Sequence, residues 1–358
     1  MTDKLRLPAE EIYGAELKAL KASDKGQKPK GWALSPQAAV TYVMGGKAGK
    51  TTITPKYVGN RRLIETAVAT LATDRALLLL GVPGTAKSWV SEHIAAAVSG
   101  DSTRVIQCTA GTDENQVRYS WNYAQLLAKG PSREALVPTP LFRSMEEGKI
   151  CRLEELTRMG SDVQDTLITV LSEKMLPIPE LNDAVYAARG FNVIATANDR
   201  DKGVNELSAA LKRRFNVVVL PLPDDMDEEI AIVSKRVGEM AASLELPAPK
   251  NVAEEVTRVL AIFRELRGGE TLDGKATLKS PSGSLSTAEA IAVMVGGLSH
   301  AAFFNGGELS ADGLAAPVLG AIVKDPVQDK AVLEEYLETV LKSRREYSDY
   351  YSALTDLI

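Results

Sequence analysis

The chain has 358 residues, of which 45% are apolar, 25% charged and 5% aromatic, so it has the composition of a globular protein with room for two domains and an aliphatic core. Its net charge of −5 argues against a dedicated nucleic-acid binder, and its two cysteines and two histidines argue against a disulfide framework or a zinc site. The N-terminus has no apolar signal core, and no apolar run reaches the roughly 18–20 residues of a membrane span, so we expect a cytoplasmic protein without one.

Residues 1–50 form what we interpret as an N-terminal accessory segment. The sequence predicts a short helix over 15–22 and a second helix opened by the pair Ser35-Pro36, where serine caps the helix and proline fits its first turn. The lysine-rich run between them indicates a solvated linker rather than a binding patch.

Residues 51–223 show the pattern of an α/β domain. An amphipathic helix is expected over 61–75, and short apolar runs indicate buried strands at 76–80, 104–108, 149–153, 191–195 and 217–220. Helical patterns lie between several of these runs, which predicts a parallel sheet covered by helices on both faces.

Residues 224–358 lack strand patterns and indicate a smaller helical domain. We expect helix over 227–266, 286–304 and 330–358, with the Gly-, Ser- and Thr-rich segment 267–286 as a long loop or small hairpin.

A phosphate-binding loop is predicted between the strand at 76–80 and a helix over 89–98. Its residues are Gly81, Val82, Pro83, Gly84, Thr85, Ala86, Lys87 and Ser88. This strand–loop–helix context is the one that a Walker A loop requires, because backbone N–H groups and the helix N-terminus must face phosphate oxygens. We assign these residues and the adjacent Trp89 to nucleotide binding, with Lys87 reaching the β- and γ-phosphates and Ser88 holding Mg²⁺. Ala86 stands where the motif has glycine, and a methyl group is tolerable there if φ is negative.

A second motif, which consists of acidic residues, follows the strand at 149–153. Glu154 and Glu155 follow one another at the strand tip, where a Walker B acid holds magnesium and the next acid activates the attacking water. Glu154 stands where aspartate is usual, and its extra methylene changes the reach of the carboxylate. Arg152 within the strand is also unusual, and we expect it to point to a sheet edge or a neighbour. The alternative is an ordinary strand end with surface acids.

The ordered series of motifs over roughly residues 56–300 resembles the MoxR-type AAA+ ATPases. The phosphate loop resembles theirs, including alanine before the lysine, and Glu154-Glu155-Leu156-Thr157-Arg158 resembles their Asp-Glu-Ile-Asn-Arg. Further matches are the stretch beside the adenine at Val58-Gly59-Asn60, a helix and hairpin at 164–179, the sensor 1 strand at 191–198 and the arginine-finger segment at 207–215. Several motifs in order are more specific than any one of them.

The resemblance implies an ATP- and Mg²⁺-dependent ATPase with a P-loop sheet and a helical lid. Asn198 would orient the water for Glu155, while Ser88 and Glu154 would hold the metal. Arg214 would enter the site of the next subunit and stabilise the charge on the transferring phosphoryl group. In related NTPases such an arginine raises the rate of hydrolysis by roughly 10³–10⁵-fold. Arg213 is the competing candidate for this finger.

The resemblance also implies a homo-oligomeric ring, of six subunits, that remodels a protein partner such as a von Willebrand factor A domain protein. Two departures favour other functions. Residues 280–289 contain no basic residue where a sensor 2 arginine is expected, which favours a nucleotide-gated scaffold with little hydrolysis. A nucleic-acid motor is the other alternative, which the acidic balance disfavours. Residues 112–138 form either a pore-facing insert or a surface excursion.

Overall fold

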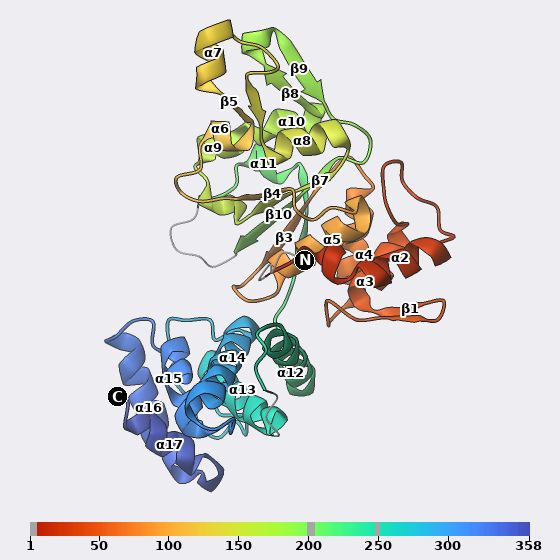
Figure 1. Ribbon diagram of the computed structural model, residues 1–358. Helices are drawn as coiled ribbons and strands as arrows, with labels where there is room; N and C mark the ends of the chain where they lie inside the picture. The colour runs from red at the N-terminus through yellow and green to blue at the C-terminus, as the bar shows by residue number, and fades with distance from the viewer. Residues whose placement is uncertain (1–5, 199–204, 248–250) are drawn as a thin grey trace. The chain divides into compact units, whose positions relative to one another are not determined.

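The computed structural model describes residues 6–198, 205–247 and 251–358 (Figure 1). The chain divides into two compact units. Unit 1 comprises residues 1–81 and 86–220, and unit 2 comprises residues 82–85 and 221–358. Each unit has its own hydrophobic core.

The centre of unit 1 is a five-stranded parallel sheet in the order β11-β3-β10-β7-β4. Its strands are β3 (Ala76–Gly81), β4 (Val105–Gln107), β7 (Ile150–Glu154), β10 (Asn192–Asn198) and β11 (Phe215–Val219). The sequence predicted all five, and the parallel P-loop architecture is therefore confirmed. Because side chains alternate along a strand, Leu77 and Leu79 enter one core cluster while Ala76 and Leu78 enter the other.

Helices cover both faces of this sheet (Figure 1). On the face reached by Leu77 lie α3 (Pro36–Met44), α4 (Arg61–Leu71) and α5 (Lys87–Ser99); on the other lie α8 (Pro140–Glu147), α9 (Ser161–Asp165), α10 (Leu167–Glu173) and α11 (Ala209–Lys212). Cys108 and Cys151 are buried as free thiols in the second cluster, and burial raises the pKa of each to about 12. They pack as apolar residues.

The N-terminal segment packs into the first of these clusters. It contains α1 (Ala9–Ile12), α2 (Gly14–Ser23), α3 and the hairpin of β1 (Gly46–Ala48) and β2 (Thr51–Ile53). Both helices expected here are present, and the Ser35 hydroxyl accepts the backbone N–H of Ala38 at 3.2 Å as the predicted cap. Leu20, Trp32 and Tyr42 of this segment pack in one core with α4 and α5.

Residues 112–138 fold as α6 (Glu114–Val117), β5 (Tyr119–Trp121), α7 (Tyr123–Lys129) and β6 (Leu136–Pro138), with β5 and β6 antiparallel. They lie beside a second hairpin of β8 (Met175–Ile178) and β9 (Asp183–Tyr186) (Figure 1). Arg118 donates to the Pro177 carbonyl at 2.7 Å, and the Tyr119 hydroxyl donates to Glu180 at 2.8 Å. Arg118 and Tyr119 thus anchor residues 112–138 to the second hairpin.

Unit 2 is helical: α12 (Met226–Ser243), α13 (Val252–Gly268), α14 (Thr287–Phe304), α15 (Ala311–Ile322), α16 (Gln328–Thr339) and α17 (Ser348–Thr355). The single helix expected over 227–266 is wrong, because α12 ends at Ser243 and α13 begins at Val252; residues 248–250 lie outside the described residues. The helix expected over 330–358 is also wrong, because 3₁₀ turns at Leu341–Ser343 and Arg345–Tyr347 interrupt it. Helix α15 was missed, since it contains Pro317 and two glycines.

Helix α14 is long and apolar enough, by length and composition alone, to cross a membrane; no other helix in the described ranges is. Its residues Ala290, Val293, Met294 and Leu298 are buried in the core of unit 2 together with residues of α12, α13 and α15. The core helix of a folded domain meets the same criterion, so we assign α14 to that core.

Candidate nucleotide-binding site

The residues predicted to act on nucleotide meet at the carboxyl ends of three adjacent strands. Gly81 ends β3, Glu154 ends β7 and Asn198 ends β10. Asn198 lies opposite Gly81 in the β10–β3 register, so the sensor 1 position is next to the start of the phosphate loop. Ligands of open α/β sheets bind at this edge, where the strand order changes direction.

The phosphate loop turns through three residues with positive φ. Gly81, Gly84 and Ala86 have φ of 158°, 82° and 63°. The condition of a negative φ at Ala86 is therefore not met: this residue adopts the left-handed conformation immediately before α5. Such a conformation costs an L-residue roughly 1–2 kcal/mol, and left-handed residues of this kind occur in the backbone nests that bind anions.

Lys87 and Ser88 are the first two residues of α5. Lys87 is 8% exposed, and its Nζ donates to the Gly81 carbonyl at 2.8 Å, so the ammonium lies at the end of β3. Ser88 Oγ donates to Glu154 Oε2 at 2.6 Å. A buried cation, a hydroxyl and a helix N-terminus thus converge at one point, and together they suit a polyphosphate anion.

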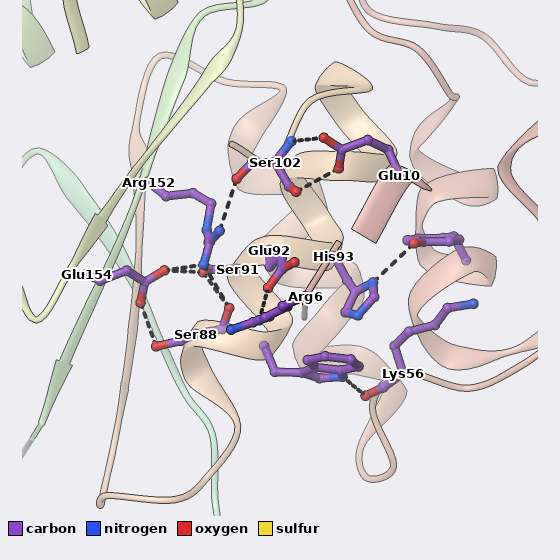
Figure 2. Close-up of polar contacts among 12 residues, drawn as sticks. Arg6, Glu10, Lys56, Ser88, Ser91, Glu92, His93, Ser102, Arg152 and Glu154 are labelled. Carbon is purple, nitrogen blue, oxygen red and sulfur yellow. Dashed lines mark hydrogen bonds and ion pairs between the residues drawn. The ribbon is translucent and has the colours of Figure 1, made fainter. Parts of the chain in front are cut away.

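The Glu154 carboxylate is held on both of its oxygens (Figure 2). Oε2 accepts from Ser88 and from Thr196 Oγ1 at 2.8 Å, while Oε1 accepts from Ser91 Oγ at 2.5 Å and from Arg152 at 2.8 Å. Burial by itself would raise the pKa of Glu154, but Arg152 and the three hydroxyls outweigh it and hold the pKa below its ordinary value. The carboxylate is therefore ionised at neutral pH.

Arg152 points toward α5 rather than to a sheet edge or a neighbour, which corrects our expectation. Residues 150, 152 and 154 share one face of β7, and α5 covers that face. Ser91 and Thr196 were not among the residues predicted from the sequence. Periodicity places Ser91 one helical turn after Ser88, and Thr196 two residues before Asn198 on the same face of β10, but it does not indicate that both contact Glu154.

Glu155 is separated from Glu154 by a sharp change of backbone direction. It has φ 58°, and its N–H donates to Thr196 Oγ1 at 3.0 Å. Its side chain is 39% exposed and pairs with Arg158 at 2.5 Å. The two adjacent acids therefore have different surroundings, one enclosed by protein donors and the other open to solvent.

The predicted base-binding stretch lies where the N-terminal segment meets α5. Trp89 Nε1 donates to the Lys56 carbonyl at 2.7 Å, two residues before Val58 and three before Gly59 (Figure 2). Lys56 itself pairs with Glu16 of α2, and its Nζ lies 4.2 Å from the centre of the Tyr42 ring. These contacts connect the backbone at Lys56 to α5 and to the N-terminal segment.

The two arginines of the finger segment are arranged differently. Arg214 Nε donates to Ser172 Oγ at 2.5 Å, and its NH1 donates to the Ala210 carbonyl. Arg213 is exposed, and its carbonyl accepts from Arg75. Arg214 thus lies against its own subunit at the surface of unit 1, while the Arg213 side chain extends into solvent.

The residues present fit a magnesium ion that is shared with phosphate. Ser88 Oγ and Glu154 Oε2 are hard oxygen donors within 2.6 Å of each other. Within residues 6–198, 205–247 and 251–358 there is no group of three or more His, Cys, Asp or Glu side chains that would hold a metal alone. This donor set is typical of Mg²⁺, which keeps several waters and takes its remaining ligands from substrate phosphates.

Two families match the chain. Residues 76–215 match the AAA domain of the dynein-related subfamily, and residues 227–356 match the YehL-like AAA+ ATPase C-terminal domain. The uncharacterized protein YehL of Escherichia coli is 41% identical over 356 residues, which cover 97% of this chain and 96% of YehL. An uncharacterized protein of Staphylococcus haemolyticus is 28% identical over 153 residues, and the match spans 57% of its length.

Solved structures resemble the fold. NtrX from Brucella abortus in complex with ADP aligns with a TM-score of 0.52 at 14% identity, over 83% of this chain and 64% of the NtrX chain. Its complex with ATP aligns with a TM-score of 0.50, also at 14% identity. At this identity the likeness extends to the fold alone.

Proposed function

Because this chain belongs to the YehL-like AAA+ ATPases, we propose that it binds ATP with Mg²⁺ and hydrolyses it to ADP and phosphate. The observation that carries the proposal is that Lys87 and Ser88, at the N-terminus of α5, contact the carboxyl ends of two sheet strands, Lys87 through the Gly81 carbonyl of β3 and Ser88 through Glu154 of β7. In this proposal residues 51–223 are the nucleotide-binding core, residues 224–358 the helical lid, and residues 1–50 an accessory segment.

The proposed chemistry divides among residues at the three strand ends. Lys87 and the loop N–H groups bind the phosphates, and Ser88 and Glu154 hold Mg²⁺, which neutralises phosphate charge when bound. The Glu155 carboxylate accepts a proton from the attacking water, and the Asn198 amide orients that water. The exposure of Glu155 supports its role as base, because a water must reach it.

A neighbouring copy completes the proposed site. We assign the finger to Arg214, with Arg213 as the alternative; Arg214 is half-buried and Arg213 exposed, and their position at the surface of unit 1 supports a contact in trans. The oligomer is a ring, of six subunits by resemblance to MoxR-type ATPases. The proposed activity is chaperone-like remodelling, in the cytoplasm, of a protein partner such as a von Willebrand factor A domain protein.

The test of hydrolysis compares phosphate release by the wild type with that of Glu155→Gln. We expect the variant to lose about 100-fold in turnover while it keeps nucleotide affinity, because removing a positioned general base typically costs 10²–10⁴-fold. Equal rates near background in both proteins would instead support a nucleotide-gated scaffold. Glu154 in place of aspartate and the absence of a basic residue in 280–289 favour that second candidate.

The trans finger is tested by mixing variants. Arg214→Ala and Glu155→Gln should each be inactive alone, while a mixture of the two regains part of the turnover, because some interfaces then pair an intact Glu155 with an intact Arg214. Arg213→Ala is the matched control and should keep most of its activity. If Arg213→Ala is the inactive variant, the finger is Arg213. Capture of partners by Glu155→Gln with ATP then identifies the client.

A further inference from the structure

The arginine within the Walker B strand has no part in the function proposed above. Arg152 is 7% exposed, although arginine is rarely buried unless it is paired. Three of its nitrogens donate to four acceptors: Nε to Ser91 Oγ at 3.0 Å, NH1 to the Ser102 carbonyl at 3.0 Å, and NH2 to Glu154 Oε1 at 2.8 Å and the Ser88 carbonyl at 3.1 Å. The guanidinium therefore ties β7 to α5 at the level of the predicted metal ligands.

The two carboxylate oxygens of Glu154 have separate surroundings. Oε1 is held by Arg152 and Ser91, and Oε2 by Ser88 and Thr196. Because Arg152 and Ser91 fix Oε1, the plane of the carboxylate cannot rotate without breaking both contacts. Oε2 consequently remains directed at Ser88, the residue that we assign to Mg²⁺.

The length of the acid matches this arrangement. The glutamate side chain is one methylene longer than that of aspartate, and its Oε1 reaches Ser91 in the second turn of α5. Thr196 connects the same carboxylate to the next residue, since Thr196 Oγ1 donates to Glu154 Oε2 and accepts the N–H of Glu155. The orientation of Glu154 is thereby coupled to the backbone that carries the proposed base.

We infer that Arg152 is a positioning residue, which with Ser91 orients Glu154 so that glutamate replaces aspartate as the Walker B acid on the magnesium side. The inference deepens the proposed function and rests on it. Partners that orient a metal-side ligand typically contribute about 10–100-fold to metal affinity, so removal of Arg152 should weaken Mg²⁺ binding rather than nucleotide binding itself.

The experiment measures the affinity of the full-length protein for a fluorescent N-methylanthraniloyl ATP at increasing Mg²⁺ concentration. The midpoint is the Mg²⁺ concentration at which half of the increase in nucleotide affinity is reached. For Arg152→Met we expect the midpoint to rise about tenfold, with affinity in EDTA unchanged. Arg152→Lys should show a smaller rise, because lysine keeps the charge but not the planar fork of donors. Ser91→Ala should also raise the midpoint. Arg104→Met, which removes an arginine paired with Asp101 and Glu147, is the matched control and should match the wild type.

A double-mutant cycle separates positioning from general stability. Glu154→Gln should raise the midpoint, and Arg152→Met added to it should raise it no further, because Arg152 acts through Glu154. If Arg152 had only a structural role, Arg152→Met would have a lower melting temperature than the wild type, and the Mg²⁺ midpoints of Arg152→Lys and Ser91→Ala would be unchanged. That result, additive effects, or a lowered midpoint would overturn the inference.

The control Lys87→Ala keeps the two proposals apart. If the wild type binds the fluorescent nucleotide no better than Lys87→Ala, the proposed function fails and the inference fails with it. If the wild type binds in a Mg²⁺-dependent manner but none of the Arg152 and Ser91 variants moves the midpoint, only the inference fails.

Discussion

Buried charge is arranged differently in the two units. In unit 1 three buried charged residues, Lys87, Arg152 and Glu154, gather at the carboxyl edge of the sheet, on the side of the phosphate loop. The buried Lys56 and Glu92 are paired elsewhere in that unit, with Glu16 and Arg6. In unit 2 the buried carboxylates are dispersed over three helices, and each has its own set of donors within that unit; they are Glu229, Glu255, Glu265 and Asp329. A buried carboxylate thus indicates a binding site only where its neighbours also face a ligand-binding loop.

The carboxylates of unit 2 connect its helices. Glu229 of α12 accepts from Arg264 of α13 and from Thr287 of α14. Glu265 of α13 accepts from the Tyr336 hydroxyl of α16 at 2.6 Å and from Arg344 at 2.9 Å. Because helix packing leaves these groups no access to water, each contact that is lost leaves a charge uncompensated.

The largest expected effect follows from Glu265. Glu265→Ala should lower the free energy of unfolding by about 3–5 kcal/mol, because it leaves Arg344 and Tyr336 without their acceptor. Urea denaturation of the two proteins measures this loss. Glu334→Ala, at an exposed pair with Lys330, is the control and should leave the midpoint unchanged. Equal midpoints for all three proteins would contradict the connecting role of these carboxylates.

A smaller effect, on binding rather than stability, is expected at Lys87. Lys87→Ala should weaken ATP affinity about 100-fold, or about 2.7 kcal/mol, since it removes the cation that contacts the phosphates. Titration with fluorescent nucleotide measures the change. Lys149→Ala removes a lysine that donates to the Ser99 carbonyl at the opposite end of β7, and its affinity should equal that of the wild type. If Lys87→Ala kept its ATP affinity, the buried charges of unit 1 would not differ from those of unit 2 by serving nucleotide binding.

The third prediction concerns acid stability and Asp329. Burial would raise the pKa of this fully buried carboxyl, but hydrogen bonds from Asp325, Ser282 and Lys324 outweigh it and hold the pKa below its ordinary value. A lowered pKa in the folded state means that the carboxylate stabilises the fold above its unfolded pKa of about 3.9, and that this stability is lost as pH falls through the folded value.

Asp329→Asn should therefore lose about 2 kcal/mol at pH 7, where hydrogen bonds to the ionised group are lost. The difference from the wild type should shrink as pH falls below about 4. Thermal unfolding of both proteins between pH 7 and pH 3 measures it. A difference that is the same at every pH would show that the charge of Asp329 contributes nothing.

The smallest expected effect is at Ala86. Because φ is 63° there, Ala86→Gly should raise the free energy of unfolding by about 1 kcal/mol or less, as relief of left-handed strain is partly offset by the flexibility of glycine. Thermal unfolding in the absence of nucleotide tests this. A destabilised variant would show that the alanine methyl makes packing contacts that outweigh the strain.

Local sequence patterns were sufficient to predict the strands of the sheet and the position of the phosphate loop. Five apolar runs predicted five strands, because strands buried on both faces need continuous apolar sequence. The position of the loop followed from its place between a strand and a helix. Helix ends in unit 2 were less predictable, since the end of α12 at Ser243 and the interruption at 340–347 depend on how the chain turns in a packed bundle rather than on apolar periodicity.

The sequence by itself determined which residues of the site are chemically capable: a lysine and a serine after a glycine-rich turn, two acids at one strand tip and an asparagine at another. Tertiary structure alone decided that Arg152 points at Glu154, that Ser91 and Thr196 share its carboxylate, and that Ala86 is left-handed. The physical reason is that strand order and helix packing join positions more than 40 residues apart, and no local pattern along the chain records which of them meet.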